Sequence, residues 1–145
     1  MSGLSELKEK VQRILAANWR VELTENGFYV RGESTGCVIT CYEVEETENE
    51  WTYVRFSSLI LIDVPITDEF LRYVASSILR FGGLFVVFSE SGDTGTLILS
   101  HTILGNYLDT EELNIALSSV FFTADDLDDE LQQRFGGQRS IDGRE

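Results

Sequence analysis

The stretch from Leu84 to His101 constrains the fold of this chain more than any other. Five apolar residues run without a break from Leu84 to Phe88, and a second apolar run, Leu97 to Leu99, follows a segment rich in Ser, Gly and Asp. This pattern predicts two strands joined by a tight turn. A strand with one wet face alternates apolar and polar residues, because successive side chains point to opposite faces. The unbroken run therefore predicts a strand covered on both faces, by helices on one and by another element or another chain on the other.

The composition is that of a globular protein with a strongly acidic surface. The chain has 145 residues, 43% of them hydrophobic, and a formal net charge of −14. This length suits one domain with a substantial core. A surface of this charge repels the phosphates of nucleic acids and of anionic membranes, so we expect neither as a partner. It favours protein partners that are basic, or apolar and basic.

The beginning of the chain and its two cysteines both indicate a cytoplasmic protein. Residues 1–15 carry interspersed glutamates and lysines and no continuous apolar run, which predicts neither a signal peptide nor a membrane span. Cys37 and Cys41 are four residues apart on a predicted strand, which separates them by about 13 Å, beyond the ~7 Å over which two Cα positions can be bridged. We expect two buried, reduced thiols.

The first half of the chain predicts one helix followed by antiparallel strands. Apolar residues at helical spacing predict a helix from Gly3 to Ala17. The pair Asn26-Gly27 predicts a two-residue hairpin turn that places Leu23 opposite Val30. Two longer strands follow, Gly36 to Glu45 and Trp51 to Ile62, with an acidic turn from Glu45 to Glu50 between them and Pro65 outside any strand ladder.

The second half predicts two more helices around the central hairpin. Thr67 to Phe81 is expected to be a helix that Gly82-Gly83 ends. The last helix, Thr110 to Phe135, begins with a capping box at Asp109 and Glu112. The order of elements predicts an α+β fold, a single antiparallel sheet with helices packed on it. We expect one domain over residues 1–137 and a polar tail over residues 138–145.

Short motifs that match catalytic sites are better explained as turns. Asp93-Thr94-Gly95 matches the aspartic-protease triplet, and residues 32–36 match Gly-x-Ser-x-Gly. Each lies in a predicted hairpin turn, without the second carboxylate or the strand-turn-helix context that the chemistry needs. Ser100 and His101 are neighbours on one strand and point to opposite faces, so they cannot form a dyad. We expect no enzyme activity.

The candidate metal ligands lack the spacing of known sites. His101 and the two thiols are scattered, whereas structural zinc takes four ligands, commonly with tight Cys-x-x-Cys spacing. The acidic run near the C-terminus lacks the glycine and the alternation of a calcium loop. It predicts a solvated helical face instead, made by Asp125, Asp126, Asp128, Asp129 and Glu130. We expect neither a metal nor another cofactor.

A series of short segments in the C-terminal half forms a moderately specific signature. They are Ser100–Gly105, Leu108-Asp109, Glu111–Leu113, Ala116-Leu117, Thr123–Leu131 and Arg134–Gly137. Together they resemble the YbjN and type III secretion chaperone-like family. The resemblance implies a helix–three strands–helix–two strands–helix fold and small, acidic, bacterial, cytoplasmic proteins that often form homodimers. It also implies that extended segments of client proteins are bound, and it carries over no catalytic residue.

Alternation on the two long strands separates a core face from a second apolar face. We assign Cys37, Ile39, Cys41, Val54, Phe56 and Ile60 to the helix-packed core. The opposite face then carries Val38, Tyr42, Val44, Trp51 and Tyr53. A hairpin brings Val44 near Trp51 and Tyr42 near Tyr53, which makes an aromatic patch with acidic residues around it. Such a patch suits a partner surface, for a client or for a second copy of the chain, and both alternatives stay open.

Together these patterns predict a non-enzymatic, chaperone-like module of the bacterial cytoplasm that binds peptides or proteins and forms a homodimer. The alternative is a regulatory protein that signals by docking a folded partner. A client bound as an added strand or as a peptide in a groove would favour the first function. A rigid interface with a globular partner would favour the second.

Overall fold

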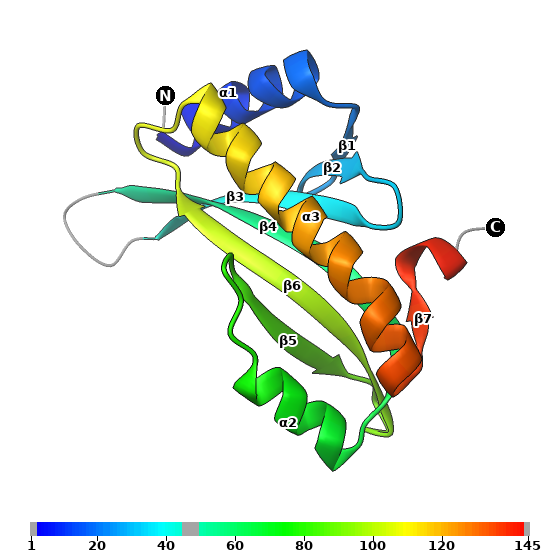
Figure 1. Cartoon of the computed structure of the whole chain (residues 1–145). Helices are drawn as coiled ribbons and strands as arrows, with labels where there is room; N and C mark the ends of the chain where they lie inside the picture. The colour runs from blue at the N-terminus through cyan, green and yellow to red at the C-terminus, as the bar shows by residue number, and fades with distance from the viewer. Residues whose placement is uncertain (1–2, 45–49, 144–145) are drawn as a thin grey trace.

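The computed structural model describes residues 3–44 and 50–143 of the chain. It contains three α-helices, seven strands and one short 3-10 turn in an α+β arrangement (Figure 1). The helices are α1 (Gly3–Asn18), α2 (Asp68–Ser76) and α3 (Thr110–Phe135), and the 3-10 turn is η1 (Ser140–Gly143). The strands are β1 (Val21–Thr24), β2 (Gly27–Arg31), β3 (Gly36–Val44), β4 (Trp51–Pro65), β5 (Gly83–Phe88), β6 (Thr94–Leu104) and β7 (Gln138–Arg139).

All strands belong to one antiparallel sheet in the order β1-β2-β3-β4-β6-β5. The pairing of β3 with β4 ends at Ser58, and β7 pairs with β4 farther along, at Leu61 and Ile62. The predicted fold class is therefore confirmed. Four strands rather than three precede α2, and the short β7 follows α3.

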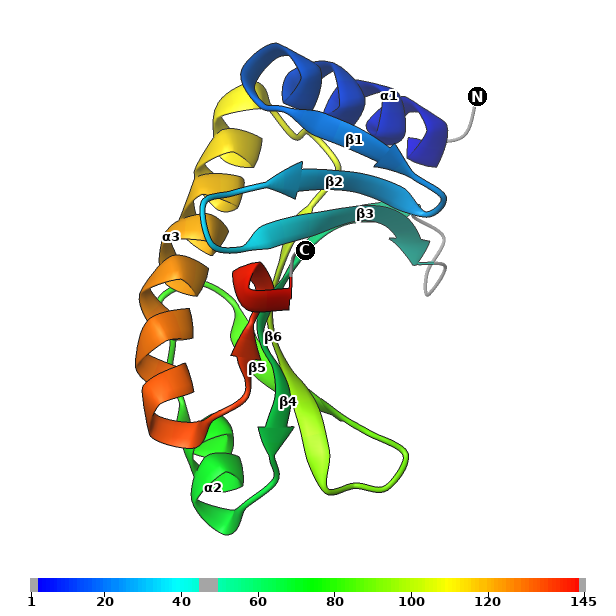
Figure 2. The same cartoon turned by 90° about the vertical axis from the view of Figure 1, so that its right-hand side faces the viewer.

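The helices cover one face of the sheet (Figure 2). The buried side of α1, for example Val11 and Leu15, shares one core with the buried side of α3, for example Leu117. The sheet residues of this core are the predicted ones: Cys37, Ile39, Cys41, Val54, Phe56 and Ile60 are all buried. Among the described residues, no helix packs on the opposite side of the sheet, which we call the open face.

The ends of two helices show how capping decides helix length. Asp109 caps α3, since its carboxylate accepts from the Glu112 backbone N–H at 2.8 Å, and the predicted helix of residues 110–135 is confirmed. The prediction that the second helix continues to Phe81 is wrong, because α2 ends at Ser76. The Ser76 hydroxyl donates to a backbone carbonyl of the last turn, at 2.6 Å, and such local bonds compete with helix continuation. Ile78 in the link that follows is 96% exposed.

The first hairpin has a different register from the predicted one. Val21, not Leu23, lies opposite Val30, and Leu23 lies opposite Phe28, so the turn is made by residues 25–26. Gly27 belongs to β2, where a Cβ atom would lie 2.2 Å from the backbone oxygen of Ile39. The glycine therefore permits close approach of β2 to β3 rather than a turn with positive φ. The register shift of two residues keeps each side chain on its predicted face.

Two expectations about the central strands are also wrong. Pro65 is not outside the ladder but is the last residue of β4, opposite Thr94, where a strand tolerates proline at its end. β5 is an edge strand, and its residues Phe85, Val87 and Phe88 are exposed, so the described part of the chain does not cover both of its faces. The middle of the strand order is occupied by β3 and β4, and β6 separates β4 from the edge strand β5. The acidic turn predicted at Glu45 to Glu50 lies outside the described residues except for Glu50.

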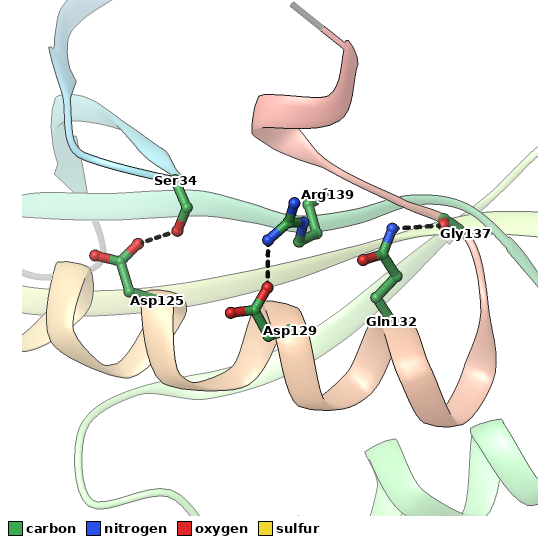
Figure 3. A network of polar contacts seen from close by, with 6 residues as sticks. All are labelled: Ser34, Asp125, Asp129, Gln132, Gly137 and Arg139. Atoms are coloured by element: carbon green, nitrogen blue, oxygen red, sulfur yellow. Dashed lines mark hydrogen bonds and ion pairs between the residues drawn. The ribbon is translucent and has the colours of Figure 1, made fainter.

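The segment expected to be a polar tail continues the fold beyond Gly137. Residues 138–139 form β7 on β4, and residues 140–143 form η1. Figure 3 shows the contacts that hold this segment against α3: Arg139 pairs with Asp129, and the Gln132 side chain donates to the Gly137 carbonyl at 3.3 Å. The backbone at Gly137 has φ +84°, and a Cβ there would lie 2.8 Å from the Ile62 oxygen, so glycine is required at this sharp return.

Candidate partner-binding surface

The five residues predicted to bind a partner lie together on the open face, and we call them the aromatic patch: Val38, Tyr42, Val44, Trp51 and Tyr53. The β3–β4 register places Val44 opposite Trp51 and Tyr42 opposite Tyr53, as predicted. The two tyrosine rings stack with their centroids 5.5 Å apart and their planes 24° apart. Val38 and Trp51 are solvent-exposed, while the tyrosines are half-buried. The patch is thus an ordered apolar surface without a cover among the described residues.

Arg55 orders the centre of this surface. Its guanidinium carbon lies 4.7 Å from the centroid of the Tyr42 ring, and its Nη2 donates to the Tyr42 hydroxyl at 3.3 Å. The Tyr42 ring therefore interacts with both a cation and the Tyr53 ring. A cation over an aromatic face contributes about 0.5–1 kcal/mol at an exposed site. The patch is accordingly pre-organised, which lowers the entropy that binding would cost.

Three strands extend the apolar surface beyond the predicted residues. Tyr53 lies opposite Leu104 of β6, and Leu59 lies opposite Ile98, which in turn lies opposite Phe85 of β5. Leu104, Leu59 and Phe85 are all exposed. The alternation of β6, with Ile98, Ser100, Thr102 and Leu104 on one face, carried the signal for this extension. The alternation did not show where β6 lies in the sheet, because one of its two neighbours is β4, a strand far away in the sequence.

The open face offers contact area rather than reactive groups. Between its two apolar ends runs a band of Thr40, Arg55 and Thr102, which the register places side by side. The motifs that match catalytic sites lie elsewhere, and each was expected to be a turn. Each is instead a turn that leads into a strand, because Gly36 begins β3 and Thr94 and Gly95 begin β6. In one, the Gly32 N–H donates to the Thr35 carbonyl at 2.8 Å; in the other, the Ser89 N–H donates to the Thr94 carbonyl at 2.9 Å. Ser34 of the first motif donates its hydroxyl to Asp125 at 2.6 Å (Figure 3).

The two thiols are free and buried on the core face, as predicted. Burial raises the pKa of Cys37 to about 12 and that of Cys41 to about 11, and a nearby lysine, Lys8, opposes the shift at Cys41. His101 also lies on the core face, where burial lowers the pKa of its imidazole. Since the thiolate is the reactive form of cysteine, these thiols are structural groups.

One prediction about the acidic run on α3 is wrong. The run was expected to be a solvated helical face, but Asp128 is buried at 1% exposure, and its two carboxylate oxygens have no hydrogen-bond partner among the described residues. Asp125 is also engaged, because it accepts hydrogen bonds from Ser34 and Thr35 at 2.6 and 3.0 Å. Helical spacing places position 128 on the same side as Ala124 and Leu131, which are both buried.

Comparison with known families places the chain in one of them. A family model described as TY-Chap1, T3SS (YopN, CesT) and YbjN peptide-binding chaperone 1, matches residues 6–143. The chain belongs to the TY-Chap1 family. The resemblance inferred from the C-terminal segments is thereby confirmed, and it extends over nearly the whole chain. A search of curated proteins gives no match.

Membership of the TY-Chap1 family supports a chaperone-like role in which a peptide or protein is bound, and a role other than catalysis. The match includes β7 and η1, so these last elements belong to the family's domain. None of the described helices is long and apolar enough to cross a membrane.

Proposed function

We propose that the chain is a peptide-binding chaperone of the bacterial cytoplasm and that the aromatic patch is where its clients bind. The observation that carries the proposal is a sheet face with ordered, partly exposed aromatic rings and no covering helix among the described residues. Tyr and Trp give a large contact area with a polar handle, which suits many different client sequences.

The net charge of −14 favours clients that combine basic and apolar residues. Long-range attraction of such clients speeds encounter at low salt and weakens as salt rises, because the Debye length falls from about 30 Å at 0.01 M to ~8 Å at 0.15 M. Contacts with the rings of Tyr42 and Tyr53 depend much less on salt. We therefore expect added salt to slow association more than it speeds dissociation.

The test is an array of short unstructured peptides in which net charge and apolar content vary independently. The peptides that bind are then titrated by fluorescence anisotropy against wild type and the double variant Trp51→Ser/Tyr53→Ser. We expect the double variant to lose about tenfold or more in affinity. Leu23→Ser is the matched control, because Leu23 is an exposed apolar residue of the same sheet, distant in register from the patch, and should leave affinity unchanged.

Equal affinity of a folded double variant would contradict the proposal, and circular dichroism establishes whether the variant is folded. Trp51→Ser alone serves if the double variant unfolds, because Trp51 is exposed at the start of β4. Binding of a folded partner, with no binding of unstructured peptides, would favour the regulatory alternative instead.

A homodimer is a second part of the proposal. β5 is an edge strand with exposed Phe85, Val87 and Phe88, and an exposed apolar edge is a template for pairing with another chain. Two-fold pairing through β5 would cover the edge that the described residues leave unpaired. Sedimentation should give twice the chain mass at micromolar concentration, and a mass near 16.4 kDa would contradict a dimer.

A cytoplasmic location completes the proposal. The two buried, free cysteines support it, because reducing compartments keep thiols unpaired. Fractionation of the host cell, followed by detection of the chain with an antibody, checks this expectation, and recovery in an extracytoplasmic fraction would contradict it.

A further inference from the structure

The helix-covered side of the sheet carries a second apolar surface, which we call the α3 groove. It is a hollow of about 260 Å³ beside the N-terminal half of α3. The link between α2 and β5 contributes one wall through Phe81. The hollow lies among Phe81 of the link, His101 and Ile103 of β6, and Ile115, Ala116 and Ser119 of α3.

An apolar stripe on α3 continues the groove along the helix. Ile115 is 54% exposed and Phe122 is 72% exposed. They are seven residues apart, which is about two helical turns and ~10.5 Å, and so they lie on one side of the helix. Ser119 lies between them on the same side and lines the hollow with Ile115. A helix that shows apolar residues to solvent at this interval has the pattern used to pack against another helix.

The charges around the groove are negative. Glu112 lines the hollow, and Glu111 lines the shallow surface that adjoins it through Ile115 and Ser119. Together with the cap residue Asp109, these two glutamates place three carboxylates at the start of α3. The helix dipole contributes a positive charge of about +0.5 at this end, which is smaller than their combined negative charge. Neither lining set contains a lysine or an arginine among the described residues. His101 offsets the carboxylates little, because burial lowers the pKa of its imidazole and so disfavours the charged form.

The size of the hollow decides between a small molecule and a side chain. Sites for small molecules typically enclose about 300–1,000 Å³ and bury most of the ligand. The hollow of 260 Å³ falls below that range and opens onto the exposed stripe of α3. It suits one or two large apolar side chains projecting from a segment that lies along α3.

We propose that the α3 groove binds an amphipathic helix of a protein client, with a large apolar side chain in the hollow and lysines or arginines beside Glu111 and Glu112. The inference rests on the proposed function in taking the ligand to be a client protein. It adds a second site on the opposite side of the sheet from the aromatic patch, and it names the secondary structure that this site selects.

The test uses a designed helical peptide of leucine and lysine, labelled with fluorescein, in which the leucines follow the i, i+3, i+4, i+7 pattern. A peptide of the same composition in scrambled order keeps the charge and removes the apolar face. A third peptide carries glutamate in place of lysine. We expect wild type to bind the leucine-lysine helix at least about tenfold more tightly than either control peptide.

Two variants probe the groove itself. Ser119→Trp fills the hollow, and Ile115→Ser removes an exposed apolar wall at a position that tolerates polar residues. Each should weaken binding of the helix by about tenfold. Leu23→Ser and the double variant Trp51→Ser/Tyr53→Ser should leave it unchanged, because these residues lie outside the groove.

Equal binding of the scrambled peptide, or undiminished binding by folded Ile115→Ser and Ser119→Trp, would overturn the proposal. Loss of helix binding in Trp51→Ser/Tyr53→Ser alone would also overturn it, by assigning the helix to the aromatic patch and so supporting the proposed function. Helix binding that needs Ile115, with no binding of unstructured peptides to the patch, would support the groove and contradict the proposed client site.

Discussion

Asp128 offers a quantitative test of how α3 packs on the sheet. Its carboxyl group is buried without a hydrogen-bond partner among the described residues, whereas its neighbours Asp125 and Asp129 are engaged by Ser34 and Arg139. Burial raises the pKa of Asp128 above the usual 3.8, because the protein interior disfavours the charged form. The folded protein therefore binds this proton more tightly than the unfolded chain does. It follows that the free energy of unfolding falls as pH rises from 3.8 toward the raised pKa of the folded state.

Two substitutions separate charge from hydrogen bonding at this position. Asp128→Asn keeps the shape and removes the charge, and Asp128→Leu also removes the unpaired polar atoms. An unsatisfied buried polar group costs about 1–3 kcal/mol, so we expect Asp128→Leu to raise the free energy of unfolding at pH 7 by about that amount. For 145 residues, an unfolding entropy of about 2.1 cal/mol/K per residue converts this into a rise in Tm of roughly 3–10 °C.

The assay is urea unfolding at a series of pH values from 4 to 7, followed by circular dichroism. The gain of Asp128→Asn over wild type should be largest at pH 7 and should vanish toward pH 4. Asp126→Asn is the matched control, because Asp126 is an exposed neighbour with the same charge, and its effect should stay within about 0.5 kcal/mol. A gain that does not change with pH, or a loss of stability in Asp128→Asn at pH 7, would refute the argument that the carboxyl group is unpaired.

Two further predictions concern the core and a helix cap. Burial holds the pKa of Cys37 at about 12 and that of Cys41 at about 11, so at pH 8 both should react slowly with a disulfide reagent and rapidly after denaturation. Fast reaction in the native protein would contradict their burial. Asp109→Ala should lower the free energy of unfolding by about 1 kcal/mol through loss of the α3 cap, whereas Asp109→Asn should retain most of it. Equal stability of the alanine and asparagine variants in urea would exclude this role of the side chain.

Local signals predicted the elements that the structure contains, and non-local contacts explain the differences. The capping box at Asp109 and the alternation around Ile39 depend on neighbours in the sequence, and both predictions are confirmed. The apolar run Leu84–Phe88 suggested a central strand, because composition does not reveal which strand ends at the edge of a sheet. The helical period that continues to Phe81 was overridden at Ser76, where hydroxyl groups bond back to the helix.

The candidate surface was predictable where two strands adjoin in the sequence. The pairs Val44–Trp51 and Tyr42–Tyr53 follow from one hairpin, and the register confirms them. Leu104 belongs to the same surface because β6 pairs with β4. These two strands are separated in the sequence by α2 and β5, so no local pattern predicts their pairing. The buried state of Asp128 was missed for a related reason. Acidic composition predicted exposure, while the packing of α3 on the sheet decided otherwise.

The position of β6 between β4 and β5 governs the order in which this chain can assemble. The hairpins β1–β2 and β3–β4 close locally, but β4 acquires its second neighbour only after α2, β5 and β6 have been made. Pairing strands this far apart in the sequence closes a long loop, and the chain loses conformational entropy before the contacts between the strands offset that loss. The β4–β6 step is therefore slow relative to the closing of local hairpins. During synthesis, the apolar face of β4 stays uncovered until β6 and α3 have been made. In this interval the nascent chain is most prone to aggregation.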